Sequence, residues 1–189
     1  MSASVARWVS IIAHPFVMVT ALVIAVAFRR GISREAVPAL LLVIAVGLLP
    51  VGFLMVRQVR RGSWANVDAS NRSERPILFV VGIVGLITLL GCTFFVHPVS
   101  FLFRGGVVVL AMISVCAVAN RWLKVSLHMA FGALAATALV FLGSPVGWVL
   151  AVVLPALAWS RLTLGRHERS EVAAGLVLGF LAGYAVYRF

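Results

Sequence analysis

The chain has 189 residues, of which 63% are hydrophobic and 11% are charged. Soluble domains are typically about 45–50% apolar, so this composition excludes a protein whose whole surface meets water and indicates an integral membrane protein. The net charge of +11 comes from 16 basic and 5 acidic residues. Because the basic residues are divided among short segments between apolar stretches, they argue against nucleic acid as a partner.

Seven apolar stretches follow one another along the chain, and a helix needs about 20 apolar residues to cross a membrane. The first three are long, and the later ones are short and rich in Gly and Ala, which suits helices packed closely in a bundle. The stretches cover residues 8–28, 36–56, 77–96, 105–120, 127–142, 146–159 and 172–187. We therefore predict an all-α fold: a polytopic transmembrane helical bundle with six or seven membrane segments in a single domain, 1–189. Prolines are expected to kink helices or mark their ends, as in His14-Pro15.

If all seven stretches cross, the loops 57–75, 121–124 and 161–171 share the side of the N-terminus. These loops contain three polar segments, so topology alone predicts that the polar segments meet at one face. Eleven of the 16 basic residues fall on that side and five on the other. The positive-inside bias would make this side cytoplasmic, but seven basic residues against five remain when Arg72, Arg75, Lys124 and Arg161, which could have roles other than topology, are left out. The orientation stays open.

The first polar segment runs from Asp68 to Pro76. Arg75-Pro76 precedes an apolar helix, and proline suits a first-turn position because its missing N–H costs nothing there. Arg72 and Arg75 are one turn apart and could bind one phosphate. An ordinary basic loop beside the membrane is the alternative interpretation.

The second polar segment is Lys124-Val125-Ser126-Leu127-His128. Ser126 is a good N-cap for the helix that follows, and the free N–H groups of a helix start bind anions. His128 would lie in the first turn, where it could protonate a leaving oxygen as a general acid. The alternative is a helix cap with an interfacial histidine, with Lys124 extended towards the membrane surface.

The third polar segment reads Ser160-Arg161, five residues, His167, three residues, Glu171. Ionisable side chains at membrane depth are costly and are usually paired and functional. Residues four apart share a helix face, so we expect Glu171 to contact His167. A carboxylate on one ring nitrogen leaves the other free to attack, and Arg161 could bind phosphate oxygens. A solvated charged loop is the alternative.

The order, residue types and spacing of these segments resemble the type 2 phosphatidic acid phosphatase family of membrane lipid phosphatases. The family signatures are Lys-x6-Arg-Pro, Pro-Ser-Gly-His and Ser-Arg-x5-His-x3-Asp. The third is present with Glu171 for Asp, the second keeps Ser126 and His128, and the first keeps Arg75-Pro76 with Asp68 at the Lys position. The resemblance covers residues 68–189 as a phosphatase-like core, and residues 1–67 are N-terminal helices without a motif.

The resemblance implies a metal-independent phosphatase that needs no cofactor. His167 would be the nucleophile and form a phosphohistidine, Glu171 would orient it, and His128 would protonate the leaving oxygen. The phosphate would be bound by Arg75, Arg161 and Ser126. We expect Lys124, or less favourably Arg72, to replace the lost lysine.

The sequence thus predicts a membrane enzyme whose substrate is a lipid phosphate or diphosphate. Candidates are an isoprenoid diphosphate, phosphatidate and phosphatidylglycerol phosphate, and the expected location is a bacterial plasma membrane. The alternative, suggested by the altered first two motifs, is an inactive or weakly active relative that binds or moves phospholipids. An intramembrane prenyltransferase is disfavoured because it needs clustered aspartates and the chain has one.

Overall fold

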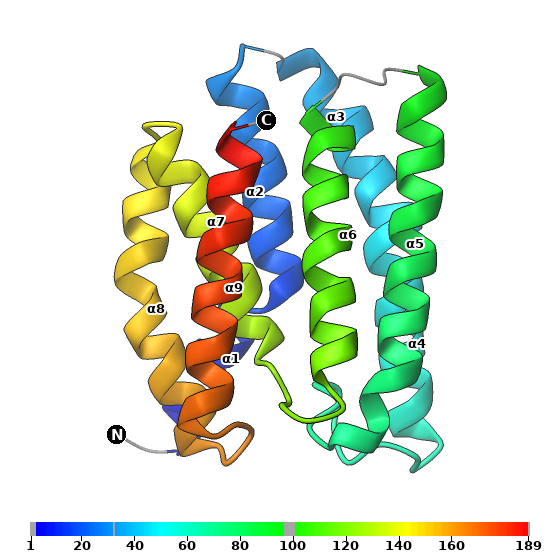
Figure 1. The fold of residues 1–189 in the computed structure, drawn as a ribbon, viewed down its shortest axis with the longest axis vertical. Helices are drawn as coiled ribbons and strands as arrows, with labels where there is room; N and C mark the ends of the chain where they lie inside the picture. The colour runs from blue at the N-terminus through cyan, green and yellow to red at the C-terminus, as the bar shows by residue number, and fades with distance from the viewer. Residues whose placement is uncertain (1–2, 32, 97–100, 189) are drawn as a thin grey trace. The chain divides into compact units, whose positions relative to one another are not determined.

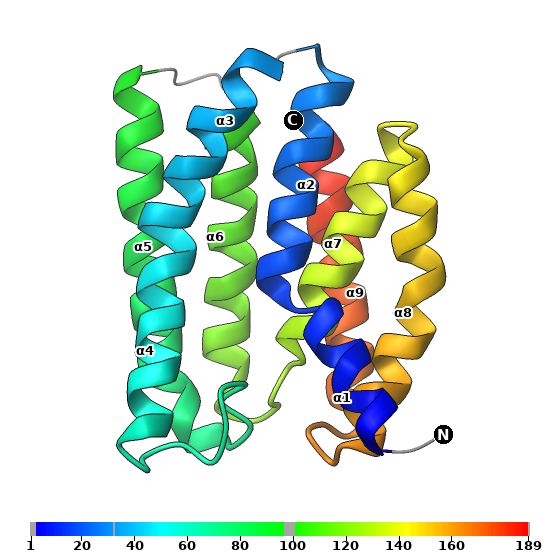
Figure 2. The same cartoon turned by 180° about the vertical axis from the view of Figure 1, so that it is seen from behind.

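The computed structural model describes residues 3–31, 33–96 and 101–188, and within these ranges every regular element is helical (Figures 1 and 2). The predicted all-α class is confirmed. The elements are α1 (Ala3–Ile12), α2 (Pro15–Arg29), α3 (Ser33–Leu42), the π-helix η1 (Val43–Leu48), α4 (Leu49–Arg60), the 3₁₀-helix η2 (Arg72–Glu74), α5 (Arg75–Val96), α6 (Phe101–Ala119), α7 (Leu127–Phe141), α8 (Pro145–Thr163) and α9 (Arg169–Arg188).

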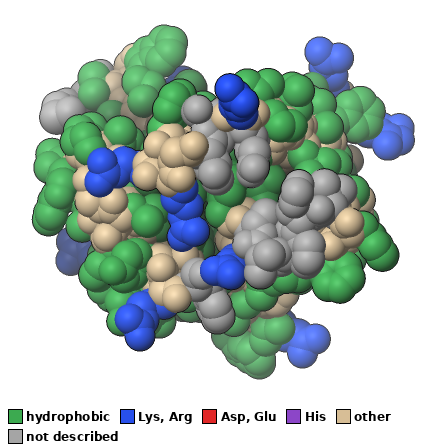
Figure 3. Space-filling model, turned by 90° about the horizontal axis from the view of Figure 1, so that it is seen from above, with side chains coloured by type: hydrophobic (Ala, Val, Ile, Leu, Met, Phe, Trp, Pro, Cys, Tyr) green, Lys and Arg blue, Asp and Glu red, His purple; other side chains and the backbone are tan. Residues whose placement is uncertain are grey.

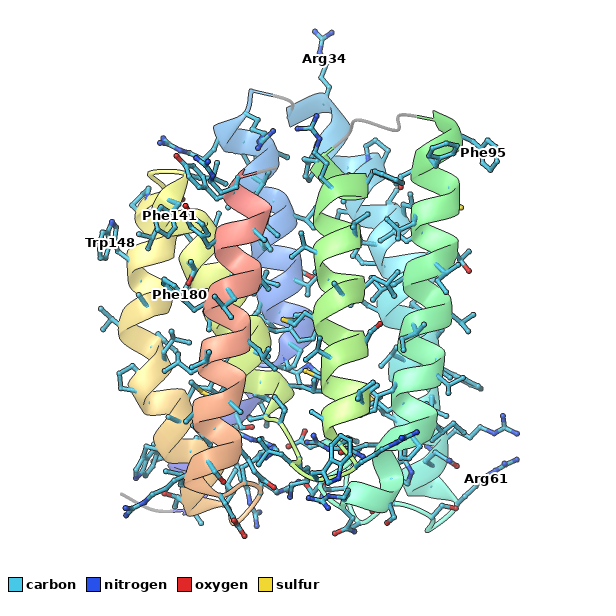
Figure 4. The ribbon with its side chains drawn as sticks, viewed as in Figure 1. Arg34, Arg61, Phe95, Phe141, Trp148 and Phe180 are labelled. Atoms are coloured by element: carbon cyan, nitrogen blue, oxygen red, sulfur yellow. The ribbon has the colours of Figure 1, made fainter. Side chains whose placement is uncertain are left out.

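Six helical segments in the described part of the chain are long and apolar enough to cross a membrane, and α7, with 15 residues, is shorter. This agrees with the prediction of six or seven membrane segments. Large apolar side chains are exposed on the outside of these helices, as Trp148 on α8 and Phe180 on α9 illustrate (Figure 4). Such side chains suit contact with lipid rather than water, so the chain is an integral membrane protein.

One compact unit combines Met1–Val37 with Val125–Phe189 and contains α1, α2, α7, α8 and α9. Helix α7 is its centre: ten of its 15 residues are buried, and it packs against α2, α8 and α9. On α9, the face towards α7 carries Gly175, Gly179 and Gly183, and a Cβ atom at any of them would clash with the α7 backbone. Small residues four apart let two membrane helices approach closely.

The first apolar stretch is interrupted, because α1 ends at Ile12 and α2 begins at Pro15. Proline has no N–H and cannot continue the hydrogen-bond ladder of a preceding helix. His14 is the N-cap of α2, and its Nδ1 accepts a hydrogen bond from the Phe16 N–H at 3.2 Å. The prediction that His14-Pro15 marks a helix end is confirmed, and the membrane-spanning segment Ala3–Arg29 consists of these two helices.

The far end of α7 is joined to α2. The Arg29 guanidinium donates from Nε and Nη2 to the Leu142 carbonyl oxygen at 3.3 and 3.1 Å. The loops after α2 and after α7 therefore lie at one end of this unit, as the topology predicts, and Ser126 begins α7 at the other. In the end view of Figure 3, Lys and Arg side chains are visible, and no Asp or Glu of the described residues is.

The second compact unit is Pro38–Lys124, which contains the second half of α3 and all of η1, α4, η2, α5 and α6. Helix α3 continues directly into the wider π-helix η1, at whose end the Leu49 N–H bonds to the Ile44 carbonyl five residues back. Pro50 has no N–H to give Val46, which explains a π-turn at this place. The Val46 carbonyl faces Gly85 on α5, where a Cβ atom would lie only 2.8 Å away.

This division of the chain differs from the motif-based boundary at residue 68. The first 37 residues fold with residues 125–189, and the first polar segment belongs to the other unit together with Lys124. The N-terminal helices are thus part of the unit that contains the second and third segments from Val125 onwards.

Candidate active site

In the second unit, the side chains of Arg75 and Lys124 both donate to backbone carbonyls of the first polar segment. The Arg75 Nε donates to the Ala69 carbonyl oxygen at 3.2 Å, and the Lys124 Nζ donates to the Ser70 carbonyl oxygen at 3.0 Å. Arg75 is 2% exposed. Ala69 is buried with a φ of 47°, a left-handed conformation that is unfavourable for alanine. The backbone of the loop is therefore locally strained at Ala69, and its carbonyls bind two basic side chains.

Glu74 folds this loop. Its carboxylate accepts hydrogen bonds from the Ala65 N–H at 2.9 Å, the Asn71 N–H at 3.1 Å and the Asn71 side-chain amide at 2.8 Å. Asn71 and Glu74 form a capping box at η2, a reciprocal arrangement that starts a helix. Sequence reasoning did not single out Glu74, although the Asn-x-x-Glu spacing before an apolar run was the available signal.

Arg72 and Arg75 have different partners. Arg72 donates from Nη1 and Nη2 to the carbonyls of Arg121 and Trp122 at 3.3 and 2.6 Å, just beyond the C-terminal end of α6. A cation near a helix C-terminus is favourable because the last carbonyls carry partial negative charge. Lys124 and Arg72 were the two residues expected to replace the lysine of the resembled signature, and Lys124 is the one that bonds to the same loop as Arg75.

The third polar segment forms a buried histidine–carboxylate pair in the first unit. The His167 Nδ1 lies 2.8 Å from the Glu171 Oε2, and the two side chains are 1% and 10% exposed. Helix α9 begins at Arg169, so His167 lies before it rather than in its first turn. The Glu171 Oε2 also accepts a hydrogen bond from the Glu168 N–H at 3.1 Å, which holds the carboxylate in place.

The expected contact between His167 and Glu171 is confirmed. A carboxylate is an acceptor only, so the imidazole nitrogen facing it carries the proton. The other nitrogen, Nε2, is then the one with a lone pair in the neutral ring. The pair therefore has the orientation that a nucleophilic histidine needs.

Ser160 and Arg161 are bound by α1. The Ser160 hydroxyl donates to the Ala6 carbonyl oxygen at 2.6 Å, and the Arg161 Nη1 donates to the Ser10 Oγ at 2.6 Å. Ser160 and Arg161 are 0% and 1% exposed. Sequence reasoning missed Ser10 because no motif marks the N-terminal helices, and only the packing of α1 on α8 brings it to Arg161.

Ser126 is the N-cap residue of α7, as predicted, but its hydroxyl makes no capping bond. Its Oγ is buried and has no hydrogen-bond partner within the part of the chain that the structure describes. The Ser126 N–H donates to the Glu171 carbonyl oxygen at 3.1 Å. This bond brings the start of α7 to the start of α9, so the second polar segment from Val125 onwards lies beside Glu171 of the third in the first unit.

His128 lies in the first turn of α7 and contacts a second histidine. Its ring is 5.1 Å from that of His14, measured between centroids, in an edge-to-face arrangement with an interplanar angle of 89°. His14 is oriented by the Phe16 N–H that it caps, and His128 is 5% exposed. Sequence reasoning gave His14 only the role of a helix end.

The structure thus brings His128, Ser126, Arg161, His167 and Glu171 into the first unit, and Arg75 and Lys124 together in the second. That both sets bind one phosphate stays a prediction.

No protein-family model, curated protein sequence or solved structure matches the chain.

Proposed function

We propose that this integral membrane protein is a lipid phosphatase that acts through a phosphohistidine. The observation that carries the proposal is the buried pair of His167 and Glu171 beside the start of α7, where the Ser126 hydroxyl makes no bond within the described residues. An oriented imidazole and the N–H groups at the start of a helix are suited to phosphoryl transfer to a histidine. The substrate would be a phosphomonoester or a diphosphate of a lipid.

In the first step, the Nε2 of His167 attacks phosphorus, and the bond between phosphorus and the lipid oxygen breaks as the P–N bond forms. Positive charge develops on the ring, and the Glu171 carboxylate at 2.8 Å stabilises it. A protonated His128 gives its proton to the leaving oxygen, so the lipid departs as an alcohol or, from a diphosphate, as a monophosphate.

In the second step, water attacks the phosphohistidine. The neutral His128 takes a proton from the water as the P–N bond breaks. Inorganic phosphate leaves, His167 returns to its neutral state and His128 is protonated again. The cycle consumes one water and needs no electron transfer.

The bound phosphate would be held by the N–H groups at the start of α7, by the Ser126 hydroxyl and by Arg161. Arginine suits this role because its planar group donates two parallel hydrogen bonds to phosphate oxygens. For the second unit, the resemblance assigns phosphate binding to Arg75, and the shared loop supports Lys124 as the replacement for the lost lysine.

A site near the headgroup level of the membrane would admit a phosphate while the lipid chains stay in the bilayer. This favours an isoprenoid diphosphate, phosphatidate or phosphatidylglycerol phosphate as substrate, and a bacterial plasma membrane as the location. A protein that only binds or moves phospholipids is the second candidate. It is favoured by the Arg72 side chain, which bonds to the carbonyls of Arg121 and Trp122 just beyond α6 instead of joining Arg75.

Phosphate release by the purified protein tests the proposal. In detergent with EDTA, the wild type should release phosphate from at least one lipid monophosphate or diphosphate, and His167→Ala should release none. A radiolabelled substrate should leave acid-labile, base-stable label on the wild type and not on His167→Ala. Lipid binding without release across the panel would favour the second candidate.

A further inference from the structure

Helices α5 and α6 of the second unit form an open groove with a volume of about 770 Å³. Small-molecule sites commonly have roughly 300–1,000 Å³, so the groove is large enough for part of a lipid. One end is lined by Arg72, Asn120 and Arg121, and the rest is mainly apolar, with Phe79, Ile83 and Ala117 among its walls. All its lining residues belong to the second unit, whereas the histidine pair belongs to the first.

The groove lies where a membrane lipid would place its headgroup. The spanning segment Arg72–Phe95 begins at the polar end of the groove, and the spanning segment Phe101–Ala119 ends there. The ends of spanning helices lie at the interface between water and hydrocarbon. From Arg75 to Ile83, α5 rises by roughly 12 Å at 1.5 Å per residue, so the apolar part extends well into the hydrocarbon.

The polar end presents donors and one unused acceptor. Arg72 and Arg121 are exposed cations. The Arg72 Nη1 and Nη2 each use one hydrogen on the carbonyls of Arg121 and Trp122, and three of the five guanidinium donors remain for a ligand. Asn120 is 7% exposed, and its Nδ2 donates to the Arg72 carbonyl oxygen at 3.3 Å. Its Oδ1 is buried and has no partner among the described residues. A buried acceptor without a donor is costly, which points to a ligand that brings a hydroxyl as well as a negative charge.

We propose that this groove binds one phospholipid with an anionic, hydroxyl-bearing headgroup of the phosphatidylglycerol type. Its phosphate is bound by Arg72 and Arg121, a headgroup hydroxyl donates to the Asn120 Oδ1, and an acyl chain lies along Phe79, Ile83 and Ala117. The site does not depend on the proposed phosphatase activity, because none of the residues required for its test belongs to the histidine pair.

Three lipids with matched acyl chains separate the contribution of the headgroup charge to binding from that of the headgroup hydroxyl. Phosphatidylglycerol has the charge and the hydroxyl, phosphatidylethanol has the charge alone, and phosphatidylcholine has neither a net charge nor a hydroxyl. Titration of the full chain in neutral detergent, followed by native mass spectrometry, should give a one-to-one adduct. Phosphatidylglycerol should bind about tenfold tighter than phosphatidylethanol, as one recovered hydrogen bond allows, and phosphatidylcholine should bind weakest.

Variants test the assigned contacts. Arg121→Gln should weaken phosphatidylglycerol binding about tenfold, as the loss of one charge-assisted hydrogen bond implies. Arg61→Gln is the matched control, since Arg61 lies in the same unit and its side chain points away from the helices (Figure 4). Ala117→Phe should block the groove, whereas Val118→Phe on an exposed position of the same helix should not.

The ranking of the three lipids by binding affinity and the effects of the variants together decide the proposal. Equal binding of the three lipids, or equal effects of Arg121→Gln and Arg61→Gln, would overturn it. Displacement of the lipid by millimolar inorganic phosphate would overturn it as well, because the groove would then be a simple anion site. Each readout is a binding ratio and stands whether or not the protein releases phosphate.

Discussion

The N–H of Ser126 donates to the carbonyl oxygen of Glu171 at 3.1 Å, so the first residues of α7 and α9 are joined although 45 positions separate them. Glu171 thus has two functions. Its carboxylate holds His167 and its backbone oxygen holds the N-cap residue of the helix that carries His128. A displacement of α9 relative to α7 would therefore move both histidines of the proposed mechanism relative to each other.

The carboxylate of Glu171 should be required for activity. In Glu171→Gln the side chain keeps its size but loses its charge, so it no longer stabilises a charged His167 ring. We expect kcat/KM on a lipid phosphate to fall by roughly 10²–10⁴-fold, the range for a lost acid–base partner. Glu168→Gln is the matched control, because it removes the same charge from an exposed neighbour, and it should keep most of the activity. Similar losses in both variants would assign the effect to local charge alone.

Lys124 should contribute more to phosphate binding than Arg72. Lys124 shares its anchoring loop with Arg75, whereas Arg72 bonds to carbonyls at the end of α6. We expect Lys124→Ala to lower kcat/KM by about tenfold or more, as the loss of a charged hydrogen-bond donor implies, and Arg72→Ala to lower it less. Steady-state kinetics on one lipid phosphate compares them. An unchanged rate in both variants would reject the idea that either residue replaces the missing lysine.

The bond between Ser10 and Arg161 should stabilise the first unit. Ser10→Ala leaves a buried arginine with one partner fewer, and such a loss typically costs about 1–3 kcal/mol in free energy of unfolding. Unfolding in mixed micelles measures it, with the exposed Ser170→Ala as control. If Arg161 also binds phosphate, Ser10→Ala should raise KM as well. Equal stability of Ser10→Ala and Ser170→Ala would show that the 2.6 Å contact contributes nothing.

The two contributions of His14 can be separated by substitution. His14→Asn keeps a side chain that caps α2 well but removes the ring beside His128, whereas His14→Phe keeps a ring and removes the cap. We expect His14→Phe to lose about 1 kcal/mol of stability, the usual value of an N-cap, and His14→Asn to retain it. His14→Asn should instead lower kcat, because His128 loses the ring that positions it. Wild-type kinetics in His14→Asn would leave His14 with a capping role only.

Composition and local spacing predicted much of this architecture. The seven apolar stretches follow from hydropathy, because a membrane segment must be apolar over a fixed length. The spacing of four residues predicted the contact between His167 and Glu171, and the contact forms although His167 lies two residues before α9. These features depend on residues that are close together in the sequence, and so they can be predicted from the sequence alone.

The remaining features depend on packing between distant segments. Nothing near Ser10 in the sequence indicates that its hydroxyl meets Arg161, and nothing near Arg72 indicates that it bonds to the end of α6. The ring contact of His14 with His128 arises because the chain breaks at Pro15 and α2 packs on α7. The Ser126 hydroxyl, which makes no hydrogen bond to the described residues, departs from local rules, because a serine at this position normally caps its helix.

The glycines of α9 should determine how closely α7 and α9 approach. A Cβ atom at position 179 would clash with the Ala130 carbonyl and the Ala133 side chain, so Gly179→Ala must push the two helices apart. Overpacking of this kind typically costs about 1–3 kcal/mol. Gly82→Ala on α5 is the control, because a Cβ atom there meets nothing within 4 Å. In mixed-micelle unfolding Gly179→Ala should be clearly less stable than Gly82→Ala, and its phosphatase activity should fall with the displaced Ser126–Glu171 bond. A variant as stable and active as the control would show that the α7–α9 contact tolerates more space than the glycines suggest.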